Sequence, residues 1–315
     1  MSQNIVEYLR ELAVGQLFAT AGFSAAWPTW KTKIQSIIPA YTEHQIYDLG
    51  DSLRDIFYTT NTSSGRSQSD VSGGGANWEA LVCWYLNLCL IGRRTVVIKH
   101  SAKLIPPCIS DAITVNYGTF PSNTESDLIA ITFPDNDEYK CDKENIVISD
   151  SNGRLVKTHK SSRSKYNHLE IIDALCNRDF SDIEVHIIQC KTNWNDNAQV
   201  PMLWDAVYSA TNFRSGVTVG LNGYSIADIR RFTYSFATVP TVKLDKIKKD
   251  SVCVLRVMYL SGGNYWGLPT KVGVANSIKE MLNRNLKTGH SDSHITTIKC
   301  ALKRIGTTYS YFNLK

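Results

Sequence analysis

The sequence lacks the patterns that would place it in several large classes of protein. Across 315 residues, no apolar run approaches the roughly 18 residues that a membrane-spanning helix needs. The first residues carry acids and an amphipathic rhythm rather than a basic start and an apolar block, so we expect no secretory signal. GxxxxGK[ST], GxSxG and HExxH motifs are absent. We therefore expect a cytoplasmic protein that makes no membrane contact. We also expect a functional site of a different kind from those that these three motifs form.

The cysteines do not form the pairs that metal sites show. None of the eight belongs to a CxxC motif, and no histidine pair at ligand spacing stands beside a cysteine pair. Most of them lie inside apolar runs, which indicates buried, reduced thiols. The sequence therefore does not predict a structural zinc site.

The composition is that of a soluble globular protein. With 43% hydrophobic and 20% charged residues, a chain of this length can bury a full core. Its net charge of +5 permits nucleic-acid binding without requiring it. Basic residues gather in two stretches, 157–165 and 243–249. Each stretch either contacts phosphates or forms a solvated face.

The hydrophobic periodicity predicts helices before strands. Residues up to about 90 have helical spacing, and Thr42 with Gln45 resembles a capping box, which predicts a helix running to about Tyr58. The polar Gly/Ser stretch 61–77 predicts an exposed loop. Asn77 is expected to cap the helix that follows, and Gly92 to end it.

The rest of the chain predicts a mixed α/β domain. Short β-branched runs predict strands, and longer amphipathic runs predict helices. The expected strands are 95–100, 112–118, 127–133, 145–150, 183–191, 215–221, 231–239 and 251–260, and the expected helices are 168–176, 200–211 and 273–287. No segment marks a linker, so we predict a single α/β domain with a helical N-terminal part (1–75), a core (76–215) and C-terminal strands and helix (216–315).

Two charged residues stand at the ends of buried strands. Asp127 opens one apolar strand, and Lys191 closes another. Period-two alternation puts Gln189 and Lys191 on the same strand face. A carboxylate and an amide oxygen can hold Mg²⁺, while the ammonium orients water or stabilises phosphate charge. The alternative is that Asp127 caps a turn and Lys191 marks the exit of its strand to solvent.

The pattern D…QxK resembles the PD-(D/E)XK nuclease superfamily and, within it, the type II restriction endonucleases. Asp127, Gln189 and Lys191 correspond to the three motif positions, and Glu79 resembles the extra glutamate that many members supply from a preceding helix. The resemblance implies a restriction-endonuclease-like mixed central sheet flanked by helices. It also implies Mg²⁺-dependent hydrolysis of double-stranded DNA by a homodimer, with Asp127, Gln189 and Glu79 as metal ligands.

The sequence departs from that motif in three ways. Ser126 stands where the motif has proline, and Gln189 is neutral, so the site has one negative charge fewer than the acidic version. The long separation of Asp127 from Gln189 requires an insertion, which we assign to about 151–178. Glu79 can supply the missing carboxylate.

A second segment spells the motif more literally. It contains Pro134, Asp135, Glu138 and Lys140. No apolar strand positions Glu138 and Lys140, whereas a catalytic constellation needs a rigid element. The site around Asp127 is therefore the preferred interpretation.

Polar residues near the preferred site are candidate DNA contacts. Amides can pair with adenine or donate to phosphates, and lysine and arginine contact phosphates. The candidates are Asn193, Asn195, Asn197, Gln199, Lys160, Arg163 and Lys165. The amides can equally bond their own backbone in a turn. Two other functions remain open: a repair or RNA-directed nuclease of the same fold, and a non-catalytic DNA-binding module that has lost a metal ligand.

Overall fold

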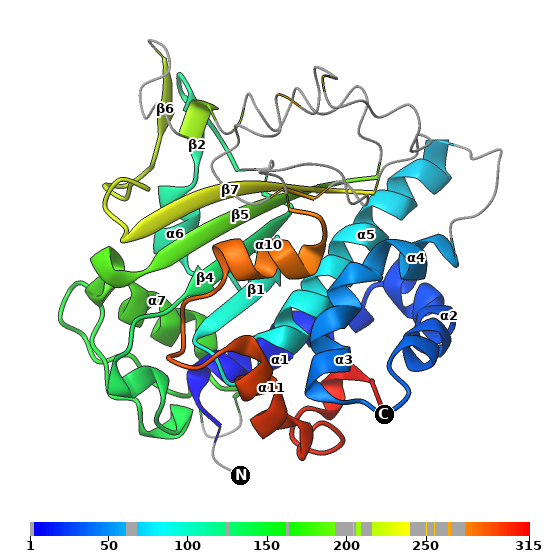
Figure 1. Ribbon diagram of the computed structural model, residues 1–315. Helices are drawn as coiled ribbons and strands as arrows, with labels where there is room; N and C mark the ends of the chain where they lie inside the picture. The colour runs from blue at the N-terminus through cyan, green and yellow to red at the C-terminus, as the bar shows by residue number, and fades with distance from the viewer. Residues whose placement is uncertain are drawn as a thin grey trace.

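The computed structural model describes residues 3–60, 68–123, 126–161, 164–192, 204, 206–208, 216–239, 250, 255, 264–265 and 275–315. A five-stranded mixed sheet lies between two layers of helices, and a smaller three-stranded sheet projects beside it (Figure 1). This arrangement confirms the predicted α/β class.

The order of strands in the large sheet brings the candidate residues to one end. Neighbouring strands are β1 (Thr95–Lys99), β4 (Leu128–Thr132), β5 (Glu184–Lys191), β7 (Arg231–Thr238) and β8 (Asn264–Tyr265). The pairs β1–β4 and β4–β5 are antiparallel, and β5–β7 and β7–β8 are parallel. The start of β4 therefore lies between the ends of β1 and β5.

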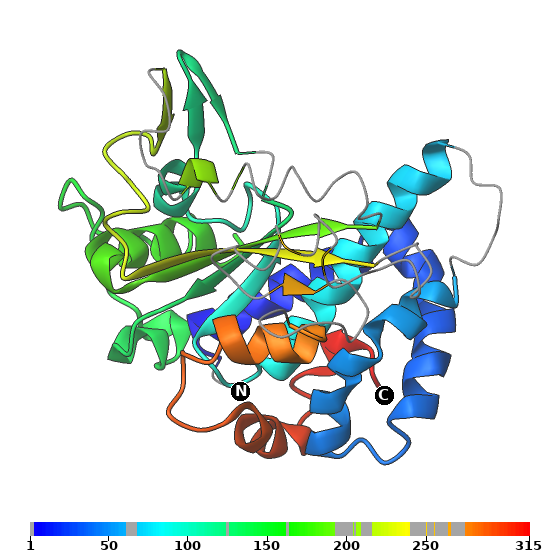
Figure 2. The same cartoon turned by 45° about the horizontal axis from the view of Figure 1, so that its top comes forward.

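Alternation along the strands divides the core into two layers. Leu128 and Ala130 of β4 face one layer, whereas Ile129 and Ile131 face the other. Figures 1 and 2 show α5 running alongside β1. The first layer contains α2 (Ala21–Ile37), α3 (Glu43–Asp48), α4 (Leu53–Tyr58), α5 (Gln68–Cys89), α10 (Ile278–Asn285) and α11 (His294–Leu302). The second contains α6 (Pro107–Ala112), α7 (His168–Arg178) and most of the buried face of α1 (Ile5–Phe18).

The predicted capping box is present, but the helix after it is short. The Thr42 side chain accepts a hydrogen bond from the backbone N–H of Gln45, and the Gln45 side chain accepts one from the backbone of Thr42. Helix α3 ends at Asp48, and a 3₁₀ turn (Leu49–Asp51) separates it from α4. The sequence therefore located the start of the helix and missed its interruption.

The predicted loop before the next helix is wrong from residue 68 onward. Helix α5 begins at Gln68, so Asn77 lies inside it and is not its cap. Gly22 of α2 lies against Asn77, and a Cβ atom at Gly22 would be 2.8 Å from the Asn77 side-chain oxygen. The buried part from Trp78 onward anchors α5 in the core. This tertiary packing outweighs the low helix propensity of the glycines.

Two of the predicted strands also differ. In 112–118, helix α6 extends to Ala112 and β2 covers only Val115–Tyr117. In 145–150 the chain alternates as a strand would, with Ile146 and Ile148 buried, but Ser149 alone forms an isolated bridge, to Leu155. Alternation is a local property, whereas a strand also needs a neighbour to complete its hydrogen bonds.

The smaller sheet is antiparallel, with β2 between β3 (Phe120–Ser122) and β6 (Val217–Val219). A two-residue turn joins β2 to β3, and Gly118 occupies its first position with φ of +62°. That conformation suits glycine and the twist of a tight hairpin.

Other predictions fall partly beyond the described residues. Within 200–211 the structure describes 204 and 206–208, all helical, and within 251–260 it describes only 255. Helix α10 confirms the predicted C-terminal helix. The cysteines of the described part have free thiols. Among the helices of the described part, none is long and apolar enough to span a membrane.

Candidate functional site

Asp127 lies in the bend that leads into β4. Its backbone carbonyl accepts a hydrogen bond from the N–H of His100 at 3.0 Å, which continues the ladder between β1 and β4. The register pairs Leu128 with Ile188, so Asp127 stands opposite Gln189 of β5. Backbone pairing therefore joins two predicted site residues that are distant in sequence.

The Asp127 carboxylate is held at the end of β5 by two groups. Its Oδ2 accepts a hydrogen bond from the backbone N–H of Cys190 at 2.7 Å. The same oxygen lies 3.9 Å from Lys191 Nζ. The side chains of Asp127 and Lys191 are 17% and 29% exposed, so this pair has access to solvent and to a ligand.

Gln189 is fully buried and shares a strand face with Lys191. Its Oε1 accepts a hydrogen bond from the hydroxyl of Tyr234 on β7 at 2.7 Å. The neighbouring strand therefore fixes the amide oxygen, since a buried acceptor needs a donor. The amide stays beside Asp127 and adds no charge to the site.

Glu79 approaches the same end of the sheet from α5. Its carboxylate pairs with Lys99 of β1 at 3.1 Å, and Lys99 Nζ also donates to the backbone carbonyl of Ala76 at 2.9 Å. Alternation places Lys99 on the Val97 face of the sheet, whereas Gln189 and Lys191 belong to the Ile187 face. Glu79 thus reaches the sheet end from the other layer.

Charged groups from both faces of the sheet influence the pKa of the Cys190 thiol. Burial raises its pKa well above the ordinary value, and the carboxylates of Asp127 and Glu79 raise it further. Lys191 and Lys99 act on the thiol in the opposite direction. Two carboxylates and two amines therefore surround the end of β5, and their formal charges balance.

The oxygen donors are of the type that Mg²⁺ prefers, which are carboxylates and an amide carbonyl. In this arrangement each donor already has a protein partner: Asp127 has Cys190 and Lys191, Gln189 has Tyr234, and Glu79 has Lys99. Within the described residues, no three His, Cys, Asp or Glu side chains form a potential metal-binding group. The donor chemistry fits a divalent ion, which would compete with Lys99 for the Glu79 carboxylate.

In the segment that spells the motif more literally, the two carboxylates do not come together at one site. Asp135 pairs with Arg94 at 3.1 Å and with Lys140 at 2.5 Å. Glu138 instead pairs with Arg178 at 2.6 Å. The segment contains a short 3₁₀ turn (Asp137–Tyr139) instead of a strand. This separation of the two carboxylates supports the preference for Asp127.

The candidate DNA contacts are only partly described. Asn193, Asn195, Asn197, Gln199 and Arg163 lie outside the described residues. Lys160 and Lys165 are exposed, and Lys160 pairs with Glu170 of α7 at 2.6 Å. The predicted insertion 151–178 includes α7, which packs its apolar side into the second layer.

Sequence reasoning missed Lys99 and Tyr234. Lys99 is the last residue of β1 and follows an apolar run, as Lys191 does in β5, so the same criterion would have found it. Tyr234 resembles an ordinary strand residue in β7, and only the pairing of β5 with β7 brings it near Gln189.

Comparison with known proteins does not assign a family. No family model matches the chain, and no significant relative is found among the curated proteins.

Proposed function

We propose that this protein is a Mg²⁺-dependent endonuclease of the type II restriction class, which hydrolyses phosphodiesters at specific sites in double-stranded DNA. The observation that carries the proposal is the approach of Asp127 Oδ2 to Lys191 Nζ, at 3.9 Å, beside Gln189. The mixed sheet, with this group at the end of its antiparallel strands, fits the restriction-endonuclease-like fold that the motif implies.

Asp127 and Glu79 are the charged ligands in this proposal, and Gln189 contributes its carbonyl oxygen. A divalent ion held by them would polarise the phosphate and lower the pKa of a water molecule. The backbone N–H of Cys190 orients the Asp127 carboxylate. Glu79, which pairs with Lys99 in the structure, would supply the second carboxylate if its side chain turned from Lys99 toward the ion.

Lys191 has two tasks in the same scheme. Its ammonium can orient the attacking water, and it can offset the negative charge that develops on the phosphate. Partial exposure lets Lys191 meet a phosphate without leaving Asp127. The amide-rich segment after Lys191 would then follow the duplex, and two protomers would cut the two strands of a symmetric site.

The proposal is tested by incubating the protein with long duplex DNA of mixed sequence, single-stranded DNA and RNA, each with Mg²⁺ or EDTA. We expect discrete duplex fragments that require Mg²⁺, with Asp127→Asn as the inactive control. Sequencing the fragment ends gives the site and the stagger. A continuous smear or cleavage of RNA identifies a repair or RNA-directed nuclease instead.

One observation favours a second candidate, a non-catalytic DNA-binding module. The oxygens of Gln189 and Glu79 are engaged by Tyr234 and Lys99, so the ligand set is held by protein partners. The same experiment separates the two functions. Duplex binding in a gel-shift assay, without cleavage in Mg²⁺ or Mn²⁺, supports the module.

A further inference from the structure

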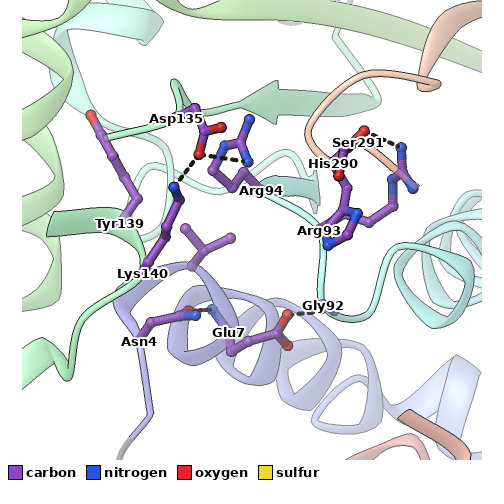
Figure 3. Close-up of a pocket in the computed structure, with 11 residues that line it drawn as sticks. Asn4, Glu7, Gly92, Arg93, Arg94, Asp135, Tyr139, Lys140, His290 and Ser291 are labelled. Atoms are coloured by element: carbon purple, nitrogen blue, oxygen red, sulfur yellow. Dashed lines mark hydrogen bonds and ion pairs between the residues drawn. The ribbon is translucent and has the colours of Figure 1, made fainter. Parts of the chain in front are cut away.

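A cavity of about 280 Å³ lies at the other end of β1 and β4, away from Asp127 (Figure 3). Four segments form it: the first turn of α1, the turn before β1, the segment after β4 and the loop between α10 and α11. The volume is slightly below the range of about 300–1,000 Å³ that is typical of ligand sites, which favours a small ligand.

Positive charge exceeds negative charge around this cavity. Arg94 and Lys140 share a single carboxylate oxygen, Asp135 Oδ1, as Figure 3 shows. The other lining carboxylate, Glu7, is already paired with Arg10 and accepts a hydrogen bond from Gly92. Asp135 therefore offsets only one of the two cations that contact it.

Arg93 adds a third, buried cation. Its guanidinium donates to the carbonyls of Lys287, Thr288 and Asp292, which are neutral acceptors, and it forms no ion pair within the described residues. Its Nε atom is buried, with no acceptor in the described part of the chain. Burial and, less strongly, the neighbouring Arg94 lower the pKa of Arg93 to about 10, and the Asp292 carboxylate offsets only part of the repulsion between the two arginines. An anion in the cavity would relieve this repulsion.

Two more features suit an oxyanion. His290 Nδ1 accepts a hydrogen bond from the Asp292 backbone N–H, which leaves Nε2 as the ring nitrogen that can donate, and the Asp292 carboxylate lies 3.9 Å from Nδ1. The cavity also borders the N-terminus of α1, where the helix dipole favours negative charge. The side chain of Asp135 is 63% exposed, so it can move into solvent when an anion of higher charge binds to Arg94 and Lys140.

We propose that this cavity binds the phosphate group of a small phosphorylated molecule, with Arg94 and Lys140 as its main contacts and Asp135 as the internal anion that it displaces. Arginine and lysine together match the geometry and charge of a phosphate. The site is separate from Asp127 and does not depend on nuclease activity.

Calorimetry of the full-length protein at constant ionic strength tests the proposal, with inorganic phosphate, pyrophosphate and adenosine 5′-monophosphate as separate probes. Lys140→Met should weaken phosphate binding about tenfold, because it removes a charge-assisted hydrogen bond. Asp135→Asn should tighten binding several-fold, because the competing carboxylate is lost. Asp228→Asn makes the same charge change at an exposed position outside the cavity lining and should leave the affinity unchanged.

The probes also distinguish the source of the phosphate. Tighter binding of the nucleotide than of inorganic phosphate indicates a nucleotide, whereas equal affinities indicate phosphate alone, and both support the site. No binding at millimolar phosphate, or equal effects of Asp135→Asn and Asp228→Asn, overturns it. Displacement of phosphate by duplex DNA in a Lys140-dependent manner would identify a nucleic-acid contact and also overturn it.

Discussion

Asp127 Oδ2 accepts the backbone N–H of Cys190 at 2.7 Å and lies 3.9 Å from Nζ of Lys191, the next residue. The shorter contact comes from the backbone, so it persists when the lysine side chain is replaced. The orientation of the carboxylate and the charge of the amine can therefore be tested separately.

Replacement of Lys191 by alanine should reduce DNA cleavage by roughly 10²–10⁴-fold, the range for loss of a positioned acid–base group. Duplex affinity should change little, because Lys191 is one of several proposed phosphate contacts and Asp127 keeps its backbone hydrogen bond. Single-turnover cleavage and gel-shift titration measure the two effects. Lys299→Ala, at an exposed position of α11, is the matched control. Undiminished cleavage by the Lys191 variant removes its catalytic role.

The sequence predicted much of the sheet that carries the site. The apolar runs of β1, β4, β5 and β7 were located to within a few residues, because each is a continuous buried strand. The alternation of Gln189 with Lys191 followed from the period of a strand. These features depend on local pattern, which a single sequence contains.

The missed features depend on distant partners. Helix α5 continues through 68–76, where glycines and serines predicted a loop, because its buried half is anchored against other helices. The contacts of Glu79 with Lys99 and of Gln189 with Tyr234 cross between elements. The hydrophobic periodicity of a single segment cannot predict contacts between side chains of different elements.

Substitution of Gln189 by glutamate should make the free energy of unfolding depend on the Mg²⁺ concentration. A second carboxylate would be buried beside Asp127, so without metal we expect a loss of roughly 3 kcal/mol in the free energy of unfolding. Mg²⁺ should restore much of that loss, and cleavage should persist at lower Mg²⁺ concentrations than in the wild type. Denaturant titration with Mg²⁺ or EDTA measures the effect. Gln189→Met supplies no oxygen and is the control; equal responses of both variants to Mg²⁺ exclude this position as a ligand.

Lys99 is predicted to compete with metal for Glu79. Because the two side chains are 25% and 20% exposed, their ion pair should contribute about 1 kcal/mol. Lys99→Met should therefore lower the half-saturating Mg²⁺ concentration for cleavage by about fivefold. Lys279→Met removes a lysine that pairs with Asp48 and Asp51, outside the site, and makes the same charge change. An unchanged Mg²⁺ requirement in Lys99→Met would show that Glu79 is not a ligand.

Two buried histidines should make the free energy of unfolding decrease as the pH falls. Burial lowers the pKa of His294 to about 4, with Arg93 adding to the effect, and burial lowers the pKa of His186 to about 3. In the unfolded chain both rings take up a proton near pH 6.5. The unfolded state therefore binds more protons as the pH falls below 6.5, and the native state loses stability down to the folded pKa values.

Each histidine should remove about 1.4 kcal/mol of unfolding free energy per pH unit between pH 6.5 and about 4. His294→Gln retains a donor for the carbonyl of Leu286, which His294 Nε2 contacts at 2.9 Å, and removes one titrating group. Its unfolding free energy, measured by denaturant titration at several pH values, should fall less steeply over this range than that of the wild type. His44→Gln, at an exposed position of α3, is the matched control. Equal slopes for His294→Gln and the wild type would mean that His294 takes up its proton equally in both states, contrary to its burial.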